Sequence, residues 1–582
     1  MKQRVILQQI GQKQSGFLIM AAAVIIVIFG LIAAFLVSML LRSSEGTIYL
    51  GASTQAEALA ESGLQQGAAN LTDDILATRQ TCTGLSATQS ISTGSFNVTA
   101  ASDAANLVNP RYAFATLSGG ITAGATPTTL TVNDSSVFAP QGRVLIGREV
   151  FRYARIANAI TLAGVVRAQD TSVATVHPSG ALVSQYQCMM DSIGSAPGVA
   201  PFGVRQYQQG MQAQTLFAVG NNGRITRWNT DTNELAWQDD SPPGAQRLNG
   251  VSVLNYHDVW AVGDRQNASN YFLVRLQGNT WSTFTVPGAS PLAQNLQGVH
   301  TTSEYEAWAV GIRAGTGGSR SFNLLRWVRD GSNSNNNWCK LPNQSLANGT
   351  CASTAITVNE TGIANKQKFL YSVVTRDTNN DGFANYGLAV GGQDGARGGA
   401  RGPNRGVVLQ YNGTQWTPLT LLANQAIGRL YGVALTPNGT SEAFFVGRSS
   451  GNNSQGKLVR LRSGVWTVVT TTRRMYAVSV IDTDGDGIAD FGCAVGDAGQ
   501  IITFDSNGIL TNVTLSGNQD FLGVSVISPT DIWAVRSNGS AYHYDGISWI
   551  QELPNTSGVR LNGVSGAFPT LSPVSSWHDV VN

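Results

Sequence analysis

Acidic residues gather in one short stretch, DTDGDGIADFG, which begins at Asp482. Asp482, Asp484, Asp486 and Asp490 alternate with glycines and other small residues that allow a tight turn. Carboxylates held this close repel one another unless a cation lies between them, and oxygen ligands suit a hard cation. We therefore predict a structural Ca²⁺ site here.

A weaker copy of this stretch, DTNNDGFANYG, offers Asp377, Asn379, Asp381 and Asn385 as oxygen ligands for a second Ca²⁺ ion. The first stretch is not an EF-hand, because Cys493 stands where an EF-hand has glutamate. It resembles the calcium loops of β-hairpins in surface proteins, and this resemblance implies the carbonyl group of Ile488 as a further ligand. For both stretches the alternative is an acidic turn held by Asx hydrogen bonds. In either case the loop would be stiffened and would not catalyse.

The five cysteines form no CxxC or Cys/His metal pattern. Cys339 and Cys351 flank a short polar loop, which favours a local disulfide. Cys82 and Cys188 could close a second bridge around one domain. Cys493 stands in an apolar run and is predicted to be a buried free thiol. Both disulfides would require an oxidising compartment.

Signs of catalysis or of nucleic-acid binding are weak. None of the five histidines pairs with Ser or Cys in a nucleophile motif. The glycine- and arginine-rich stretch 391–406 lacks the Lys-Ser/Thr ending of a phosphate loop; we predict a surface loop, with polyanion or glycan binding as the alternative. The net charge is +2 without a basic block, so nucleic acid is not an evident partner. We expect no enzymatic activity.

The two acidic stretches lie within a repeat that must position them. Elements of the type Gly-Val, as in LNGVSV and LYGVAL, alternate with elements ending in AVG, as in VWAVG and LFAVG. Each element occurs seven times, and the two sets are offset by one. Closure of a ring explains the offset: Leu561–Gly566 would complete the blade that begins at Thr215, which removes free sheet edges. Residues 205–570 are therefore predicted to form a seven-bladed β-propeller.

Two turns within the repeat, at Asn412–Trp416 and Asp545–Trp549, approach the Asp-box of sialidase-like propellers. The unit GVS…DVWAVGD also resembles the photosystem II assembly-factor propellers. Both resemblances imply the propeller fold. The repeated tryptophans are predicted to pack between blades rather than to bind a ligand.

The N-terminal region begins with a basic leader and continues into an uncharged run of 25 residues, Phe17–Leu41. As a helix this run would be about 37 Å long, enough to cross a bilayer. Basic residues precede it, so the positive-inside rule predicts a single inner-membrane span over 17–41 with the N-terminus in the cytoplasm.

The step from Gly16 to Phe17 at the start of this run resembles the class III signal of type IV pilins. The resemblance implies cleavage after Gly16, methylation of Phe17, and a helix over 17–70 that packs with other minor and major pilins. Ala21 departs from the pattern, since most pilins have glutamate there. The segment AEALAESGLQQG resembles minor pilins of the PilX and MshP type. Small and apolar residues that could pack on one face recur there at helical spacing: Ala56, Leu59, Ala60 and Gly63. The alternative is a plain single-pass anchor.

These observations predict an N-terminal transmembrane pilin helix, a small α+β pilin-like domain with a β-rich insertion, and an all-β propeller. The predicted boundaries are a leader over 1–16, the helix over 17–70, a pilin-like region over 71–117 and 180–200, a β-module over 118–184, the propeller over 205–570 and a tail over 571–582.

The resulting hypothesis is a minor type IV pilin that presents its propeller for adhesion or pilus assembly, with a glycan or host surface as a possible ligand. It would start in the inner membrane and reach the pilus tip or the periplasm. Two alternatives stay open: a membrane-anchored, sialidase-like glycan hydrolase, and a periplasmic assembly factor of the propeller type.

Overall fold

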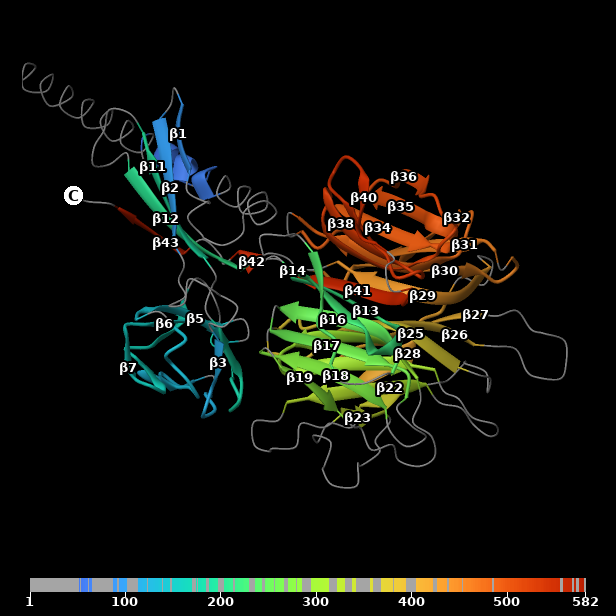
Figure 1. Ribbon diagram of the computed structural model, residues 1–582, viewed down its shortest axis with the longest axis horizontal. Coiled ribbons are helices and arrows are strands. Elements are labelled where there is room, and N and C mark those ends of the chain that lie inside the picture. The colour runs from blue at the N-terminus through green and yellow to red at the C-terminus, as the bar shows by residue number, and fades with distance from the viewer. Residues whose placement is uncertain are drawn as a thin grey trace, which may run out of the picture.

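The computed structural model describes residues within 52–64 and 87–579, both with internal gaps. The described chain forms a β-sheet near the N-terminus, a small β-module, and a ring of seven sheets (Figure 1). The ring is the predicted seven-bladed propeller, and it contains most of the described residues.

Each blade is built on four antiparallel strands, which run in sequence order from the axis outward except in blade 1, whose inner strand comes from the C-terminal end of the propeller. Blade 1 contains β41 (Leu561–Ala567), β13 (Thr215–Gly220), β14 (Ile225–Asn229) and β15 (Ala236–Asp239). Blade 2 contains β16 (Leu248–Asn255), β17 (Asp258–Gly263), β18 (Phe272–Gln277) and β19 (Thr280–Phe284). Blade 3 contains β20 (Leu296–Ser303), β21 (Glu306–Gly311), β22 (Asn323–Val328) and β23 (Trp338–Lys340). Blade 4 contains β25 (Lys368–Arg376), β26 (Tyr386–Gln393), β27 (Arg405–Tyr411), β28 (Gln415–Pro418) and an added outer strand, β24 (Thr357–Val358).

The last three blades follow the same plan. Blade 5 contains β29 (Ile427–Leu435), β30 (Glu442–Ser449), β31 (Gly456–Arg462) and β32 (Val465–Thr471). Blade 6 contains β33 (Met475–Ile481), β34 (Phe491–Gly496), β35 (Gln500–Asp505) and β36 (Ile509–Thr514). Blade 7 contains β37 (Phe521–Ser528), β38 (Asp531–Arg536), β39 (Ala541–Tyr544) and β40 (Trp549–Leu553).

Blade 1 joins the two ends of the propeller. Its inner strand, β41, comes from the C-terminal end and pairs antiparallel with β13, with Thr215 opposite Ala567 and Ala218 opposite Val564. β41 also packs beside the inner strands of blades 2 and 7. The ring is therefore closed as the offset repeats predicted, and the inner strand of blade 1 packs between those of blades 2 and 7.

The repeated Gly-Val step lets the seven inner strands approach one another. A Cβ atom added at Gly298 of β20 would lie 2.7 Å from the carbonyl oxygen of Tyr371 in β25. A Cβ atom at Gly250 of β16 would lie 2.8 Å from the carbonyl oxygen of Gln297. The following valines, such as Val299, enter the hydrophobic clusters between adjacent blades. Glycine therefore permits the close ring, and valine contributes to the packing between its blades.

A serine after the Gly-Val step links neighbouring inner strands. The Oγ atom of Ser525 in β37 accepts a hydrogen bond of 3.1 Å from the N–H group of Gly566 in β41. Ser479 accepts one of 3.1 Å from the next inner strand in the same way. In blade 3 His300 takes this place, and its Nδ1 atom accepts a 3.2 Å hydrogen bond from the N–H group of Thr375. These bonds tie one blade to the next near the axis.

The sheet near the N-terminus receives strands from both ends of the chain. Its order is β1 (Ala87–Ile91), β2 (Gly94–Ala101), β11 (Cys188–Ser195), β12 (Val204–Gln212) and β42 (Thr570–Leu571), and β43 (Ser575–Asp579) also pairs with β12. The propeller is thus inserted between β12 and β42. Residues 571–582 were expected to form a tail, but the structure places β43 in this sheet (Figure 1).

The helical residues within 52–64 lie directly on this sheet. Ala56 and Ala60 are fully buried, as the helical spacing predicted. A Cβ atom at Gly194 of β11 would lie 2.0 Å from the carbonyl oxygen of Ala56, and one at Gly63 would meet the Ser192 hydroxyl group. Small residues on both elements therefore bring the helix backbone against the sheet.

The predicted membrane location is corrected by the structure. In the described part of the chain, no helix combines the length and apolar character that crossing a bilayer requires. Residues 17–41, Gly16 and Phe17 lie outside the described residues. A single-pass inner-membrane protein that later reaches a pilus tip or the periplasm is therefore not upheld, and cleavage and methylation stay predictions.

The β-module is inserted between β2 and β11 of the first sheet. One of its sheets has the order β3 (Phe114–Thr116), β10 (Leu182–Ser184), β5 (Gly142–Ile146), β6 (Glu149–Tyr153) and β9 (Val166–Gln169). The other has the order β4 (Thr129–Thr131), β8 (Thr161–Ala163) and β7 (Arg155–Asn158). Valine, leucine and phenylalanine side chains from both sheets form one core.

The β-module is docked on the propeller through blades 2 and 3. Tyr305 of blade 3 belongs to the core of the module. Its hydroxyl group lies 2.8 Å from Nδ1 of His177, whose Nε2 lies 2.8 Å from a carboxylate oxygen of Glu149. The ring of Phe114 lies 4.7 Å from that of His257 in blade 2. The contact is therefore both polar and apolar, and it fixes the module beside these two blades.

Candidate binding site in the propeller channel

A pocket of about 160 Å³ lies where the seven inner strands meet. Six inner strands contribute three consecutive positions, namely a variable residue, a small residue and a valine, and the inner strand of blade 4 contributes the first two of these. The first residue of each triplet in the pocket lining is Asn562, Asn249, Gln297, Tyr371, Tyr431, Tyr476 or Leu522, in blade order from 1 to 7. Because the small residues and valines are set by ring packing, the variable position determines the chemistry of the pocket.

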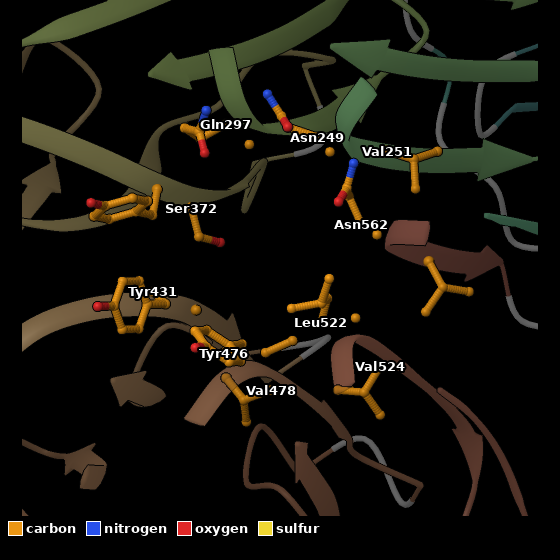
Figure 2. A pocket seen from close by; sticks show the side chains of 18 of the residues that line it. Asn249, Val251, Gln297, Ser372, Tyr431, Tyr476, Val478, Leu522, Val524 and Asn562 are labelled. Atoms are coloured by element: carbon orange, nitrogen blue, oxygen red, sulfur yellow. The ribbon is translucent and has the colours of Figure 1, made fainter. Parts of the chain in front are cut away.

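The variable residues of blades 1, 2 and 3 are amides and form what we call the amide arc: Asn562, Asn249 and Gln297. Figure 2 shows the three along one side of the pocket. Nδ2 of Asn249 donates to Asp264 and to the carbonyl oxygen of Leu296, both at 2.8 Å. Nδ2 of Asn562 donates to the carbonyl oxygen of Leu248 at 2.7 Å. The amide N–H groups of both asparagines are thus used within the protein.

The oxygen atoms of the amide arc are less well satisfied. Oδ1 of Asn562 accepts a 2.9 Å hydrogen bond from Nε of Arg560. Oδ1 of Asn249 is buried and has no hydrogen-bond partner among the described residues. A buried acceptor without a partner costs about 1–3 kcal/mol, and a donor group in the pocket would relieve that cost.

The variable residues of blades 4, 5 and 6 form the tyrosine arc: Tyr371, Tyr431 and Tyr476. Ring centroids lie 5.1 Å apart for Tyr371 and Tyr431 and 5.4 Å apart for Tyr431 and Tyr476. Figure 2 shows Tyr431 and Tyr476 on the opposite side of the pocket from Asn249 and Gln297. All three side chains are half-buried, so part of each ring is accessible.

Arginines surround the tyrosine arc at the end of the channel where the inner strands begin. Nη1 of Arg429 donates to the Tyr371 hydroxyl group at 3.4 Å. Nε of Arg474 lies 2.6 Å from a carboxylate oxygen of Asp497. Burial, together with Asp497, raises the pKa of Tyr476, so its hydroxyl group stays protonated and can donate. The arc therefore offers aromatic surface and hydroxyl groups, with charges placed around it.

The sequence contains this pattern, but sequence reasoning treated the Gly-Val elements only as signs of the fold. The residue just before each small position changes from Asn or Gln in blades 1–3 to Tyr in blades 4–6. Alignment of the seven repeats would have exposed that change. That these positions face one pocket follows only from closure of the ring.

A second repeated arrangement was also missed: an acidic residue at the start of the second strand contacts a basic residue of the third strand. The four pairs are Asp258–Arg275 at 2.6 Å, Glu306–Arg326 at 2.5 Å, Glu442–Arg460 at 2.5 Å and Asp531–His543 at 3.0 Å. Each basic group lies against an aromatic ring of the same strand pair, as Arg326 does on Trp308 at 5.3 Å. These buried groups are structural, because they lie between blades and away from the pocket.

The two glutamates of these pairs, Glu306 and Glu442, accept hydrogen bonds from the predicted metal loops. The N–H group of Ala384 donates to Glu306 at 2.5 Å, and that of Ala489 donates to Glu442 at 2.6 Å. Each loop is thus anchored on the preceding blade. The predicted stiffening of both loops therefore has a source within the protein itself.

The carboxylates of the first loop accept hydrogen bonds from its own backbone. Asp482 accepts from the N–H group of Gly487 at 2.9 Å, and Asp486 accepts from that of Ile488 at 2.7 Å. Asp490 accepts from the N–H group of Thr483 at 2.7 Å. These are bonds of the kind expected for the Asx alternative. Asp484 lies outside the described residues.

In the second loop, Asp377 accepts from the N–H group of Gly382 at 2.8 Å. Nδ2 of Asn379 donates to Asp381 at 2.9 Å, and Nδ2 of Asn385 donates to Asn379 at 3.2 Å. Among the described residues, no three His, Cys, Asp or Glu side chains are placed to hold a metal ion. Both Ca²⁺ sites therefore stay predictions.

The cysteines are placed as follows. Cys339 lies in β23 and is disulfide-bonded, whereas its predicted partner Cys351 lies outside the described residues. Cys82 also lies outside them, and Cys188 begins β11. Both pairings stay predictions. Cys493 is a buried free thiol, as expected, and burial raises its pKa.

The comparisons with known proteins establish no family. No protein-family model matches the sequence, and no curated protein matches it. Solved structures with a similar fold include YCF48 bound to a D1 peptide, at 18% identity over 53% of this chain and 82% of that chain, with a TM-score of 0.33. YCF48 from Cyanidioschyzon merolae has 17% identity over 54% and 88% of the two chains, with a TM-score of 0.35. The WD40 propeller domain of Doa1 has 11% identity over 58% and 88%, with a TM-score of 0.34. At these values the likeness carries no argument about function, and the propeller assignment rests on the closed ring of sheets.

Proposed function

We propose that this chain is a non-catalytic binding protein whose propeller holds a segment of a partner protein over its channel. The observation that carries the proposal is the buried, unpartnered Oδ1 atom of Asn249 in a pocket whose opposite wall is formed by tyrosines. Such an acceptor is satisfied when a donor enters.

The pocket lining supports binding rather than catalysis. Its residues include no carboxylate, imidazole, thiol or ammonium group. General acid–base chemistry mostly uses such groups, and tyrosine is the one residue type in the lining that can also serve. Burial raises the pKa of Tyr476, which keeps its hydroxyl group protonated and makes it a weak acid. Uncharged amides and tyrosines instead suit recognition of an uncharged group that donates hydrogen bonds and has an apolar face, such as an Asn, Gln or Thr side chain.

The size of the pocket supports a macromolecular partner. Its volume of about 160 Å³ is below the range of about 300–1,000 Å³ that is usual for small-molecule sites. A narrow pocket at the centre of a broad face suits a protein that inserts one side chain and spreads over the surrounding strand ends. This arrangement agrees with the propeller-type assembly factor among the alternatives raised by the sequence.

Selection of peptides from a random display library on the full chain tests this proposal. We expect the selected peptides to bind Tyr431→Ala about tenfold more weakly, since an aromatic wall would be lost. Binding should be unchanged in Thr511→Ala, an exposed control on blade 6. Peptides that bind Tyr431→Ala and Asn249→Asp as well as the wild type would contradict the proposal. So would channel-dependent binding of sugars on a glycan array without any binding of peptides.

A second candidate is assembly as a minor type IV pilin. The observation that favours it is the helix within 52–64, whose small residues lie on the antiparallel sheet around β11. This is the arrangement expected for a pilin-like domain. Mass spectrometry of the mature N-terminus tests it: N-methylated Phe17 supports the proposal, and an intact Met1 contradicts it.

A further inference from the structure

The outer strands of the seven blades differ in how their free edges are protected. An edge strand offers unpaired N–H and C=O groups to another chain, and proteins block such edges with charges, proline, bulges, short strands or a covering segment. We searched the seven outer strands for these features.

Six of the outer strands carry at least one blocking feature. Two strands carry an acidic residue: β15 ends with Asp239, and β40 contains Glu552 and has a register shift. Two are short: β23 has three residues, and β19 has five and adjoins the docked β-module. β28 contains Pro418 and is covered by β24, and β36 has a register shift. β32 of blade 5 has none of these.

β32 is a long and regular edge strand. It spans seven residues, Val465–Thr471, and pairs with β31 over its whole length without a register shift. It contains no charged residue, and its first residue, Val465, is 66% exposed. Among the described residues no strand pairs with its outer side. Alternate backbone N–H and C=O groups on that side are available to another strand.

Positive charge stands at both ends of this edge. Arg462 lies opposite Val465 across the hairpin, and Arg473 follows Thr471 by two residues. No carboxylate occurs over 456–474. Arg462 and Arg473 are half-buried and form no ion pair within the described part of the chain, whereas Arg460 and Arg474 have carboxylate partners.

Blade 4 shows that an outer strand of this propeller accepts an added strand. β24 pairs in parallel with β28, with Thr357 opposite Gln415 and Val358 opposite Trp416. The pairing continues through a 2.8 Å hydrogen bond from the N–H group of Asn359 to the carbonyl oxygen of Trp416. A short extended segment is thus held by backbone pairing together with the packing of Ile356 and Val358 in the adjoining hydrophobic cluster.

We propose that β32 binds an extended segment of a partner protein by strand addition, and that this segment is an uncharged, β-branched run flanked by acidic residues. The run would match the uncharged edge, and its acidic flanks would lie near Arg462 and Arg473. A second copy of this chain fits less well, because its β32 would bring further arginines toward these two. The proposal concerns the outer edge of blade 5 and is independent of the channel.

The test uses the full chain and a fluorescent peptide with the sequence Glu-Val-Thr-Val-Ile-Thr-Val-Glu, with binding followed by anisotropy. The edge variant is Thr467→Lys, which places a charge on the exposed strand. The matched control is Thr511→Lys on the outer strand of blade 6. We expect the edge variant to weaken binding at least about tenfold and the control to leave it unchanged. Amide hydrogen exchange should slow over 465–471 when the peptide binds.

A charge exchange tests the flanks separately. Arg462→Glu with Arg473→Glu should weaken binding of the acidic peptide, and a peptide with lysine in place of both glutamates should bind this double variant more tightly than the wild type. The proposal is overturned if the wild type does not bind the peptide, if Thr467→Lys binds it normally, or if the chain instead self-associates through an edge that Thr467→Lys disrupts.

Discussion

The inner and outer strands of the same blades follow different rules. The seven inner strands keep a small residue, a valine and usually a serine in register, because each packs against two neighbouring inner strands. The outer strands differ in length, charge and regularity. Tight packing therefore limits variation most strongly at the small residue and the valine, whereas the outer strands vary more widely.

This difference separates structural from binding residues. In the inner ring, the residue before the small position varies most in character, and amides and tyrosines occupy separate groups of blades there. On the outer edge, the absence of blocking features singles out β32. Both candidate binding surfaces thus lie at positions where packing of the repeat does not fix the residue type.

We expect the largest loss of stability from a substitution that breaks a contact between two blades. Glu306→Ala removes a fully buried carboxylate, which leaves Arg326 and the N–H group of Ala384 without their partner. We expect a loss of about 3–5 kcal/mol in the free energy of unfolding. Glu552→Ala in outer strand β40 should change it by less than about 0.5 kcal/mol. Denaturant unfolding followed by tryptophan fluorescence measures both, and similar losses would contradict the comparison.

The next effect depends on pH and concerns His300, which replaces serine in the inner ring. Burial, aided by Arg376, lowers the pKa of His300 to about 3, below its ordinary value of 6.5. Between these values the unfolded chain binds a proton that the folded chain does not. The stability contribution is therefore present above about pH 6.5 and is lost as the pH falls toward 3.

The variant His300→Ser restores the serine found in other blades and should flatten this pH dependence. By about pH 4 the wild type should have lost at most about 3 kcal/mol more than the variant, relative to neutral pH. Thermal unfolding of both proteins across the pH range measures the difference. Parallel pH profiles for the two proteins would show that His300 does not titrate as inferred.

The smallest expected effect compares the two acidic loops, in blades 6 and 4. If the loops bind Ca²⁺, a hundredfold excess of the ion over its Kd stabilises the protein by about 2.7 kcal/mol at most. Asp482→Asn should remove more of this effect than Asp377→Asn, because the first loop has four carboxylates and the second has two. Calorimetric melting with Ca²⁺ or with a chelator measures it; identical melting curves would leave the loops as Asx turns.

Much of the fold could be predicted from repetition. The offset between the Gly-Val and AVG elements led to seven blades and to closure through Leu561–Gly566, because an open array would expose an edge. Helical spacing correctly predicted the burial of Ala56 and Ala60. The membrane location was not upheld, and the processing site lies outside the described residues.

The candidate site could be predicted less well. Tyr371, Tyr431 and Tyr476 are far apart in sequence, and no local pattern distinguishes a tyrosine that faces a channel from one in a blade core. The acidic and basic residues of pairs such as Glu442 and Arg460 recur at regular places in the repeat. The sequence does not show that the second and third strands of a blade place them opposite each other. The return of β43 to the first sheet had no sequence signal, since it is a short strand after a long insertion.

The sequence by itself determined the repeat, its period and the residues that must be small or apolar, because hydrophobic burial and close approach act in the same way in every blade. Only the tertiary structure decided which residues meet. Ring closure places seven distant positions around one pocket, and docking of the β-module places Tyr305 beside His177. Such contacts depend on how whole sheets pack against one another, and the spacing of residues along the chain does not determine that packing.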